Sequence, residues 1–359
     1  MGGAGTLRRQ GGFPVTLRRT TEILPPARIL VTGASGLLGR SVALRLTELG
    51  YQVTTFQRSP STVSGAREVR GSLTDVAAVE EAVQGQDAII HMAAKVSVSG
   101  QREDFEQVNI VGTENIFNAA WSAGVENVVH VSSPSVAHSG DSLVGAPAGP
   151  ADPEHAVGHY AQTKAEAELI AEARGSVGIN VLILRPHLVW GPGDGQLTKR
   201  IVDRARSGRL PLLGSGAALV DTLYIDNAVD AFVAGLRRLP HLAALPPADR
   251  RLVVTNGEPR PIGELLIGIA EAGGARRPSR RISPAVAKAA GSVVEKLWAA
   301  TGPHEDEPPM TRFLAEQLST AHWFDQRRTR AVLDWTPRIS IDQGLQELAR
   351  KVRRTGRVL

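Results

Sequence analysis

The sequence contains no cysteine, which excludes disulfide bonds and thiolate metal sites and fits a reducing compartment. No apolar run reaches the roughly 18 residues that a membrane-spanning helix requires, so we predict no integral membrane span. The nine histidines show no H-E-x-x-H or other metal-ligand spacing, and we predict no metal site. These absences are typical of an ordinary globular protein, for which we expect a cytoplasmic location.

Acidic residues are scarce near the N-terminus, where most of the net charge of +5 lies. Residues 1–28 hold five arginines and one glutamate, so +4 of the +5 comes from this stretch. Charge that clusters at a terminus usually belongs to a solvated arm, and no RNA-binding motif accompanies it. We therefore predict a basic, disordered tail over residues 1–26 and no nucleic-acid partner. The stretch lacks the apolar core of a secretory signal; a transit peptide and an upstream extension are the alternatives.

A glycine-rich turn, VTGASGLLG, links a short apolar strand predicted at 27–31 to a helix predicted at 37–49. Gly33, Gly36 and Gly39 allow a tight turn, close approach of backbone N–H groups to a phosphate, and tight packing of helix on strand. A dinucleotide pyrophosphate binds in this way at a helix N-terminus. The alternative is a strand–turn–helix connection that binds nothing.

Tyr160 and Lys164 stand four residues apart in the segment HYAQTK, so both side chains lie on one face of a helix. A neighbouring ammonium favours the phenolate form of a tyrosine, whose pKa is ordinarily near 10. Such a tyrosine can donate or accept a proton near neutral pH. Alone, this spacing usually marks an ordinary helix surface. Together with the glycine-rich turn, it indicates a nicotinamide-dependent oxidoreductase.

A serine pair follows the apolar run at 128–131, which has the composition of a buried parallel strand. Ligands bind beyond the carboxyl ends of such strands, where a serine hydroxyl can reach a bound carbonyl group. Because neighbouring strand residues point to opposite sides, we assign this role to Ser133 rather than to Ser132. The alternative is a serine that simply ends a strand.

Predicted strands and helices alternate along the chain, which indicates an α/β fold with a doubly wound parallel sheet of the Rossmann type. From about Pro186 the pattern becomes irregular, which suits a smaller substrate lobe. We therefore predict an NAD(P)-binding Rossmann domain at 27–185 and a mainly substrate-binding lobe at 186–359, with some segments returning to the first domain. The predicted elements are strands at 27–31, 51–56, 88–92, 128–132 and 181–184, helices at 37–49, 77–83, 104–123 and 161–173, and a loop at 139–157.

The second predicted strand is followed by Arg58 and Ser59, a position that decides between the two nicotinamide cofactors. A site that prefers NAD places a carboxylate there to bind the ribose 2′-hydroxyl, whereas an arginine suits the 2′-phosphate of NADP. No acidic residue is adjacent in the sequence. We therefore predict NADP(H) in preference to NAD(H); the alternative is an arginine that is merely exposed.

The chain resembles the extended short-chain dehydrogenases/reductases of the 3β-hydroxysteroid dehydrogenase branch. Within that branch it is most similar to the bacterial 2-alkyl-3-oxoalkanoate reductases of olefin biosynthesis. The resemblance runs from about Arg28 to about Leu348. Besides the glycine-rich turn, it is carried by HMAAK (91–95), DFEQVNIVGTEN (104–115), SSPSV (132–136), HYAQTKAEAE (159–168), LRPHLVWGPGD (184–194), VDTLYIDNAVDA (220–231), NGEPRPIGEL (256–265) and LDWTPRISIDQGL (333–345).

The resemblance implies a role for each matching residue. Tyr160 is expected to donate a proton to a carbonyl oxygen that Ser133 also binds. Lys164 is expected to hold the nicotinamide ribose and to lower the pKa of Tyr160, and Asn109 to position a water relay. The cofactor contacts that the resemblance implies are Gly33, Ser35, Gly36, Leu37, Gly39, Arg58, Ser72, Leu73, Ala93, Ala94, Lys95, Tyr160, Lys164, Pro186, His187 and Val189.

Some positions depart from the family pattern or have a second interpretation. Ser72 replaces the aspartate that usually meets the adenine amine, so this contact would be made by a neutral group. Small polar residues follow SSPSV where the reductases carry an aromatic residue and an aspartate, which suggests an altered substrate pocket. Asn109 could instead cap or bend its helix, and His187 could be structural.

The activity we predict is NAD(P)H-dependent ketone reduction, or the reverse oxidation, on an apolar substrate such as a 2-alkyl-3-oxoalkanoate or a 3β-hydroxysteroid. One alternative is a nucleotide-sugar epimerase or reductase of the same extended family. Another is a non-catalytic NADP-sensing or assembly subunit, which would need only the glycine-rich turn. The helix predicted at 284–298 could close the substrate lobe over an apolar ligand, or rest on a membrane surface or a partner enzyme. We expect a homodimer.

Overall fold

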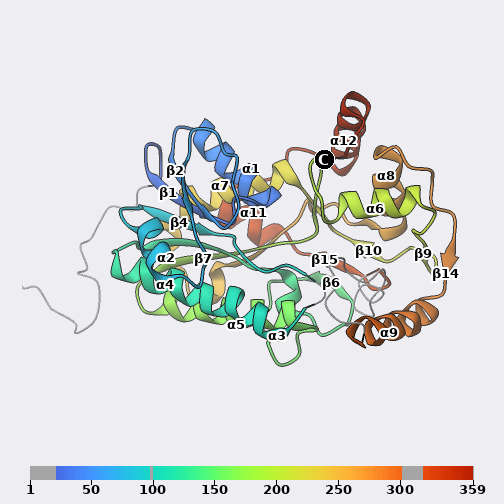
Figure 1. The fold of residues 1–359 in the computed structure, drawn as a ribbon, viewed down its shortest axis with the longest axis horizontal. Coiled ribbons are helices and arrows are strands. Elements are labelled where there is room, and N and C mark those ends of the chain that lie inside the picture. Colours follow the sequence, from blue (N-terminus) through green and yellow to red (C-terminus); the bar gives the residue numbers. More distant parts are fainter. Residues whose placement is uncertain (1–21, 98–99, 301–317, 359) are drawn as a thin grey trace, which may run out of the picture.

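A parallel sheet forms the centre of the computed structural model, which describes residues 22–97, 100–300 and 318–358, with the backbone alone for 295–300. Within these residues the sheet has seven strands (Figure 1). Their spatial order is β12 (Arg251–Val254), β7 (Asn180–Pro186), β5 (Asn127–Val131), β4 (Ala88–His91), β1 (Arg28–Thr32), β2 (Gln52–Gln57) and β3 (Arg67–Arg70). The order reverses between β1 and β4, and ligands of such sheets bind at the carboxyl ends beside this reversal.

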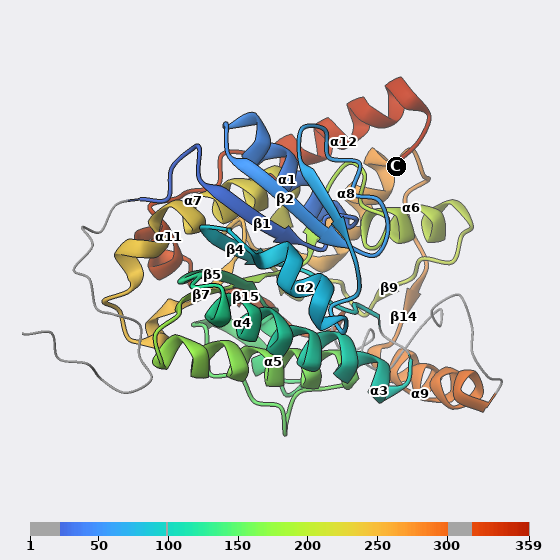
Figure 2. The same ribbon diagram turned by 60° about the vertical axis from the view of Figure 1, so that its left-hand side comes forward.

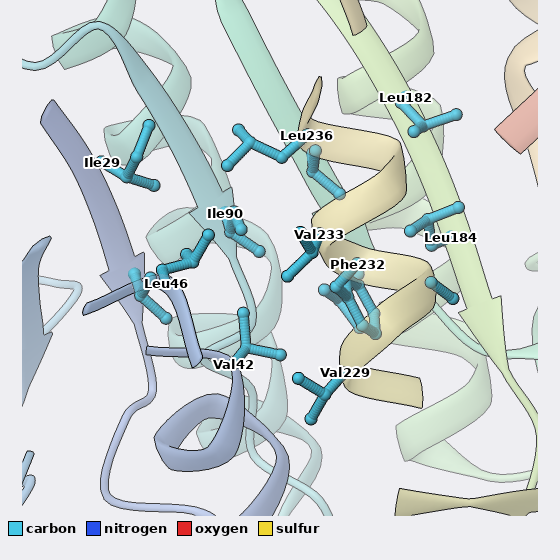
Figure 3. Packing of buried hydrophobic residues seen from close by; sticks show 14 of the residues in the cluster. Ile29, Val42, Leu46, Ile90, Leu182, Leu184, Val229, Phe232, Val233 and Leu236 are labelled. Atoms are coloured by element: carbon cyan, nitrogen blue, oxygen red, sulfur yellow. The ribbon is translucent and has the colours of Figure 1, made fainter. Parts of the chain in front are cut away.

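Helices cover both faces of the sheet, as the doubly wound prediction requires (Figure 2). One face carries α1 (Leu37–Glu48), α7 (Ile225–Leu242) and α11 (Arg327–Leu333); the other carries α2 (Val76–Val83), α4 (Gly112–Ser122) and α5 (His159–Ser176). Because both faces are covered, the central strands are apolar and buried along nearly their whole length. Figure 3 shows α1 and α7 packed on the first face through Val42, Leu46, Val229, Phe232, Val233 and Leu236, against Ile29, Ile90, Leu182 and Leu184.

A second group of elements adjoins the sheet and has its own core, formed by α6 (Thr198–Arg206), α8 (Ile262–Ala272) and α12 (Ile341–Thr355). Its four-stranded sheet has the order β13 (Arg260–Pro261), β10 (Leu219–Val220), β15 (His322–Phe324) and β6 (Leu143–Ala146). Two short pairs join β8 (Val189–Trp190) to β11 (Leu223–Tyr224) and β9 (Leu212–Leu213) to β14 (Arg281–Ile282). The remaining elements of the described residues are α3 (Arg102–Phe105), α9 (Pro284–Ala300), the π-helix η1 (Glu106–Val111) and the 3₁₀ helices η2 (Pro134–Ala137) and η3 (Pro247–Arg250).

Two predictions from the sequence need correction, and two strands were missed. The segment 139–157 is not wholly a loop, because it contains β6, which pairs with β15 from far along the chain. Two strands of the main sheet were not predicted: β3 is an edge strand rich in charged residues, and β12 has only four residues. The predicted tail ends earlier than residue 26, because Ile23 is buried and its carbonyl accepts a hydrogen bond from the Tyr51 hydroxyl at 2.9 Å. Residues 1–21 lie outside the described residues.

The helix predicted at 284–298 is present as α9. Ala287 is buried against Leu213, whereas Val286 and Val293 are exposed. The roles suggested for this helix stay predictions: closure of the substrate lobe over an apolar ligand, or contact with a membrane surface or a partner enzyme. Among the helices that the structure describes, none is both long and apolar enough to cross a membrane.

Candidate active site

The glycine-rich turn lies between β1 and α1, directly at the reversal of strand order. Gly33 has a φ of +75°, and a Cβ atom there would lie 2.8 Å from the Cα of Ala93 in the loop after β4. A Cβ atom on Gly39 would lie 2.4 Å from the carbonyl oxygen of Gly33. Ser35 and Gly36 are exposed, and the first turn of α1, described in full, has no acidic residue. This geometry fits the pyrophosphate of a dinucleotide, which binds to backbone N–H groups at a helix N-terminus.

The loop after β4 holds Ala93, Ala94 and Lys95, and two buried side chains fix it. The hydroxyl oxygen of Thr32 accepts hydrogen bonds from the backbone N–H groups of Met92 and Ala93, each at 3.0 Å. Asn109 then holds Lys95 at both backbone groups, accepting from its N–H at 2.8 Å and donating to its carbonyl at 3.3 Å. The loop is therefore held close to the glycine-rich turn.

Asn109 lies in η1, the π-helical stretch between α3 and α4. The predicted helix at 104–123 is thus continuous but widened in its first half. The Asn109 amide also donates to the Thr163 hydroxyl on α5 at 3.1 Å. Asn109 therefore ties the loop after β4 to the helix that carries Tyr160 and Lys164, a role that we did not predict. The water relay stays a prediction.

Tyr160 and Ser133 come together at the carboxyl edge of the sheet. Burial raises the pKa of Tyr160, and hydrogen bonding with the Ser133 side chain acts in the opposite direction. The Ser133 hydroxyl also accepts hydrogen bonds from the N–H and hydroxyl groups of Ser135. The Ser132 hydroxyl is buried and has no hydrogen-bond partner among the described residues. The structure thus brings Ser133, and not Ser132, to Tyr160.

Lys164 lies one turn after Tyr160 and is buried, and its ammonium donates to the Val131 carbonyl at 2.7 Å. Burial lowers the pKa of Lys164 to about 8, and the Glu168 carboxylate opposes this effect. We predicted that Lys164 lowers the pKa of Tyr160, but in this structure burial outweighs any such effect. The ammonium is instead engaged at the end of β5, two residues before Ser133.

A buried ion pair joins α5 to β7 beneath this site. Arg185 is 1% exposed and Glu168 is 0% exposed. The guanidinium donates to both carboxylate oxygens, at 2.9 Å through Nε and through a shorter contact from Nη2. It also donates to the Gly149 carbonyl at 2.8 Å. We did not predict this pair, because the sequence spacing between its members carries no local signal.

His187 belongs to a second buried group, which lies just beyond the end of β7. Its Nδ1 donates to the Asp221 carbonyl at 2.6 Å, and burial lowers its pKa to about 4. Its ring makes edge contacts with His322 and Phe324, and the Nε2 atoms of His322 and His138 lie 3.1 Å apart. In the part of the chain that the structure describes, no group of three or more His, Cys, Asp or Glu residues could hold a metal ion. His138 and His322 were not predicted as part of this site.

Arg58 directly follows β2, where it is exposed and makes no ion pair with any described residue. An acidic residue, Glu68 of β3, lies near the end of β2, which the sequence did not show. The Glu68 carboxylate accepts hydrogen bonds from the Ser61 N–H at 2.8 Å and from Arg70 at 2.7 Å, and these bonds lower the pKa of Glu68. This acid is therefore already paired. Arg58 remains available to a phosphate.

The other predicted cofactor residues lie along the same edge with different exposure. The Ser72 hydroxyl bonds to the Thr74 hydroxyl at 2.8 Å. The Leu73 side chain is buried in the core, so only its backbone can face a ligand. Leu37 begins α1, Pro186 ends β7 and Val189 begins β8, and each is partly exposed.

Comparison with known proteins shows which family has this combination of fold and motifs. Residues 29–243 match the model of the NAD dependent epimerase/dehydratase family. The chain belongs to this family. It is an NAD(P)-dependent oxidoreductase of the extended short-chain dehydrogenase/reductase type, as the glycine-rich turn and the Tyr160–Lys164 spacing predicted.

Curated relatives of the chain include two reductases and a steroid enzyme. A 2-alkyl-3-oxoalkanoate reductase from Stenotrophomonas maltophilia is 40% identical over 89% of this chain and 98% of the reductase. A protein of the same name from Shewanella oneidensis is 34% identical over 89% of this chain and 84% of its own length. A 3β-hydroxysteroid dehydrogenase/Δ5→4-isomerase from Mycobacterium tuberculosis is 28% identical over 95% of this chain and 92% of that enzyme.

Solved structures share the fold at lower identity. A dTDP-glucose 4,6-dehydratase from Streptomyces venezuelae, solved as a double mutant with NAD bound, superposes with a TM-score of 0.68 at 22% identity and covers 91% of this chain and 97% of its own. A UDP-glucuronic acid 4-epimerase from Bacillus cereus in complex with NAD gives a TM-score of 0.67 at 18% identity, covering 91% and 99%. These likenesses establish the Rossmann-type fold alone.

Proposed function

We propose that the protein reduces a ketone on an apolar substrate, with NADPH as the preferred reductant, and that the substrate is a 2-alkyl-3-oxoalkanoate. The observation that carries the proposal is the meeting of Ser133 and Tyr160 beside buried Lys164, at the strand ends that the glycine-rich turn also borders. Two relatives named as 2-alkyl-3-oxoalkanoate reductases support the substrate class.

In this proposal each residue has a defined task. The cofactor supplies a hydride when it is bound. Tyr160 donates a proton to the carbonyl oxygen as negative charge develops there, and Ser133 donates a hydrogen bond to the same oxygen. Lys164 contributes a positive charge one helical turn away and holds the ribose. Asn109 and Thr32 keep the loop after β4 in place against the glycine-rich turn.

The substrate assignment is tested by a panel of three compound classes with NADPH and NADH. We expect the absorbance of reduced nicotinamide to fall with a 2-alkyl-3-oxoalkanoate, and to fall more slowly or not at all with a steroid ketone. A nucleotide sugar should be recovered chemically unchanged, with no net change in cofactor. Turnover of a nucleotide sugar, with none of the ketones reduced, would instead support the epimerase alternative. Cofactor binding without turnover of any compound would support the sensing subunit.

Cofactor preference should depend on Arg58. A guanidinium that faces a 2′-phosphate forms a charge-assisted interaction worth about 1.5–3 kcal/mol, or roughly 10- to 150-fold in affinity. We therefore expect Arg58→Ala to weaken NADPH binding by about this factor and to leave NADH binding nearly unchanged. Added salt should reduce the preference of the wild type, because an exposed pair is screened.

Fluorescence titration of both cofactors against wild type and variant measures this effect. Arg67→Ala is a matched control, because Arg67 is an exposed arginine at the opposite end of the neighbouring strand, paired with Glu81. Equal wild-type affinity for NADH and NADPH, or equal loss of both affinities in Arg58→Ala, would show that Arg58 does not discriminate between the two cofactors.

A homodimer and a cytoplasmic location stay predictions.

A further inference from the structure

Lys164 carries its charge in a place where a charge is costly. Its side chain is buried, and its ammonium donates to a neutral backbone carbonyl, that of Val131. Removal of an ammonium from water costs several kcal/mol unless an opposite charge compensates. An amine in such a place loses its proton at a lower pH than an exposed lysine does. The site therefore needs a source of negative charge if Lys164 is to stay protonated.

Glu168 is placed to supply that charge. It lies four residues after Lys164 on α5, so the two side chains occupy the same face of the helix. It is fully buried, and Arg185 holds both of its oxygens and so fixes its position. Its carboxylate acts on Lys164 in the direction that favours the ammonium. Because Arg185 also binds the Gly149 carbonyl, the same pair anchors the loop that leads to Tyr160.

We propose that Glu168 is a positioning residue that keeps Lys164 protonated and ordered beside Tyr160, with Arg185 holding the carboxylate in place. The expected effect of Glu168 on catalysis rests on the proposed function, because the proposed function is what gives Lys164 a role in the reaction. The effect on the charge of Lys164 does not depend on any substrate.

Other titratable groups face Lys164 from the strands beneath it, and none can replace Glu168. His91 of β4 is fully buried, which lowers its pKa to about 3, and burial also holds the pKa of His130 of β5 well below its usual range. Both rings are therefore neutral at neutral pH, and their protonation would add positive charge. Arg185 of β7 is cationic, and Tyr160, whose pKa is raised, is neutral at that pH. The Glu168 carboxylate is the one negative charge in this set.

The test is a direct titration of Lys164 by NMR in protein labelled with ¹³C at the lysine Cε atoms. The sequence has only six lysines, so the signals can be resolved, and Lys164→Arg identifies the one that belongs to Lys164. We expect wild-type Lys164 to titrate well below an exposed lysine. In Glu168→Gln the pKa should be about 1 lower still, because the opposite charge that favours the ammonium has been removed. The alkaline limb of kcat/KM should move to lower pH by the same amount.

Glu166→Gln is the matched control, because Glu166 lies on the same helix but is partly exposed and pairs with Arg102. It should leave the Lys164 titration unchanged. If Glu168→Gln fails to fold because Arg185 is left unpaired, the Lys164 pKa in Glu168→Gln/Arg185→Met is compared with that in Arg185→Met, which keeps the carboxylate, and should be about 1 lower. An unchanged Lys164 pKa in the folded variant, or an equal fall in Glu166→Gln, overturns the proposal. If the wild type reduces no ketone, the proposed function fails while this titration is unaffected.

Discussion

A Tyr160→Phe variant is expected to lose about 10² to 10⁴ in kcat, the usual worth of a general acid. The substitution removes only the hydroxyl that hydrogen-bonds with Ser133, so the protein should fold and still bind the cofactor. The measurement is kcat for the preferred ketone, with circular dichroism and cofactor fluorescence on the same samples. Near-normal turnover in folded Tyr160→Phe would remove this residue from the mechanism.

Tyr51→Phe is the matched control for this experiment. The Tyr51 hydroxyl donates to the Ile23 carbonyl and accepts from Arg237, at the opposite end of the sheet from Ser133. Loss of these hydrogen bonds should cost about 1 kcal/mol of stability without a change in kcat. A comparable loss of kcat in both variants would point to a general effect of removing a tyrosine hydroxyl and not to proton donation.

An Arg185→Met variant is expected to lower the free energy of unfolding by about 3–5 kcal/mol, the cost of leaving a buried charge without its partner. Here that charge is the Glu168 carboxylate, which is 0% exposed. Denaturant unfolding measures the loss. Glu168→Gln/Arg185→Met should recover most of it, because replacement of a whole buried pair by uncharged groups is often neutral.

Arg338→Met provides the comparison for the buried pair. Arg338 also binds a carboxylate, that of Asp230, but its side chain is 70% exposed. Exposed pairs contribute about 0–1 kcal/mol, so this variant should unfold nearly as the wild type does. If Arg185→Met and Arg338→Met lose the same stability, the Arg185–Glu168 pair does not behave as a buried pair.

Local patterns predicted the parts of the molecule that depend on neighbouring residues in the sequence. Gly33, Gly36 and Gly39 between a strand and a helix indicated the turn, and the four-residue spacing of Tyr160 and Lys164 indicated a shared helix face. The apolar strands of the sheet centre were predicted because burial on both faces requires continuous apolar runs. The family assignment then followed from the same motifs, and the family match and the curated relatives confirm it.

Features that depend on distant contacts were not predictable in this way. The strand β6 exists because it pairs with β15, from which it is separated by about half of the chain. From the sequence alone Glu168 would be taken for an ordinary surface residue of a helix, and only the tertiary fold shows that Arg185 of β7 lies against it. Likewise, Glu68 reaches Ser61 only because β3 pairs with β2. In each case the strand or residue contacts a partner that is distant in the sequence, so the neighbouring residues do not indicate the contact.

The central claim, net reduction of a ketone, is tested most directly by following deuterium from the nicotinamide. NADPH that carries deuterium at both hydrogen positions of C4 is incubated with the protein and a 2-alkyl-3-oxoalkanoate, and the product is analysed by mass spectrometry. The account predicts one deuterium on the carbon that bears the new hydroxyl group, in proportion to the NADPH consumed. Retention of all deuterium in the cofactor, with no hydroxy acid formed, would contradict it.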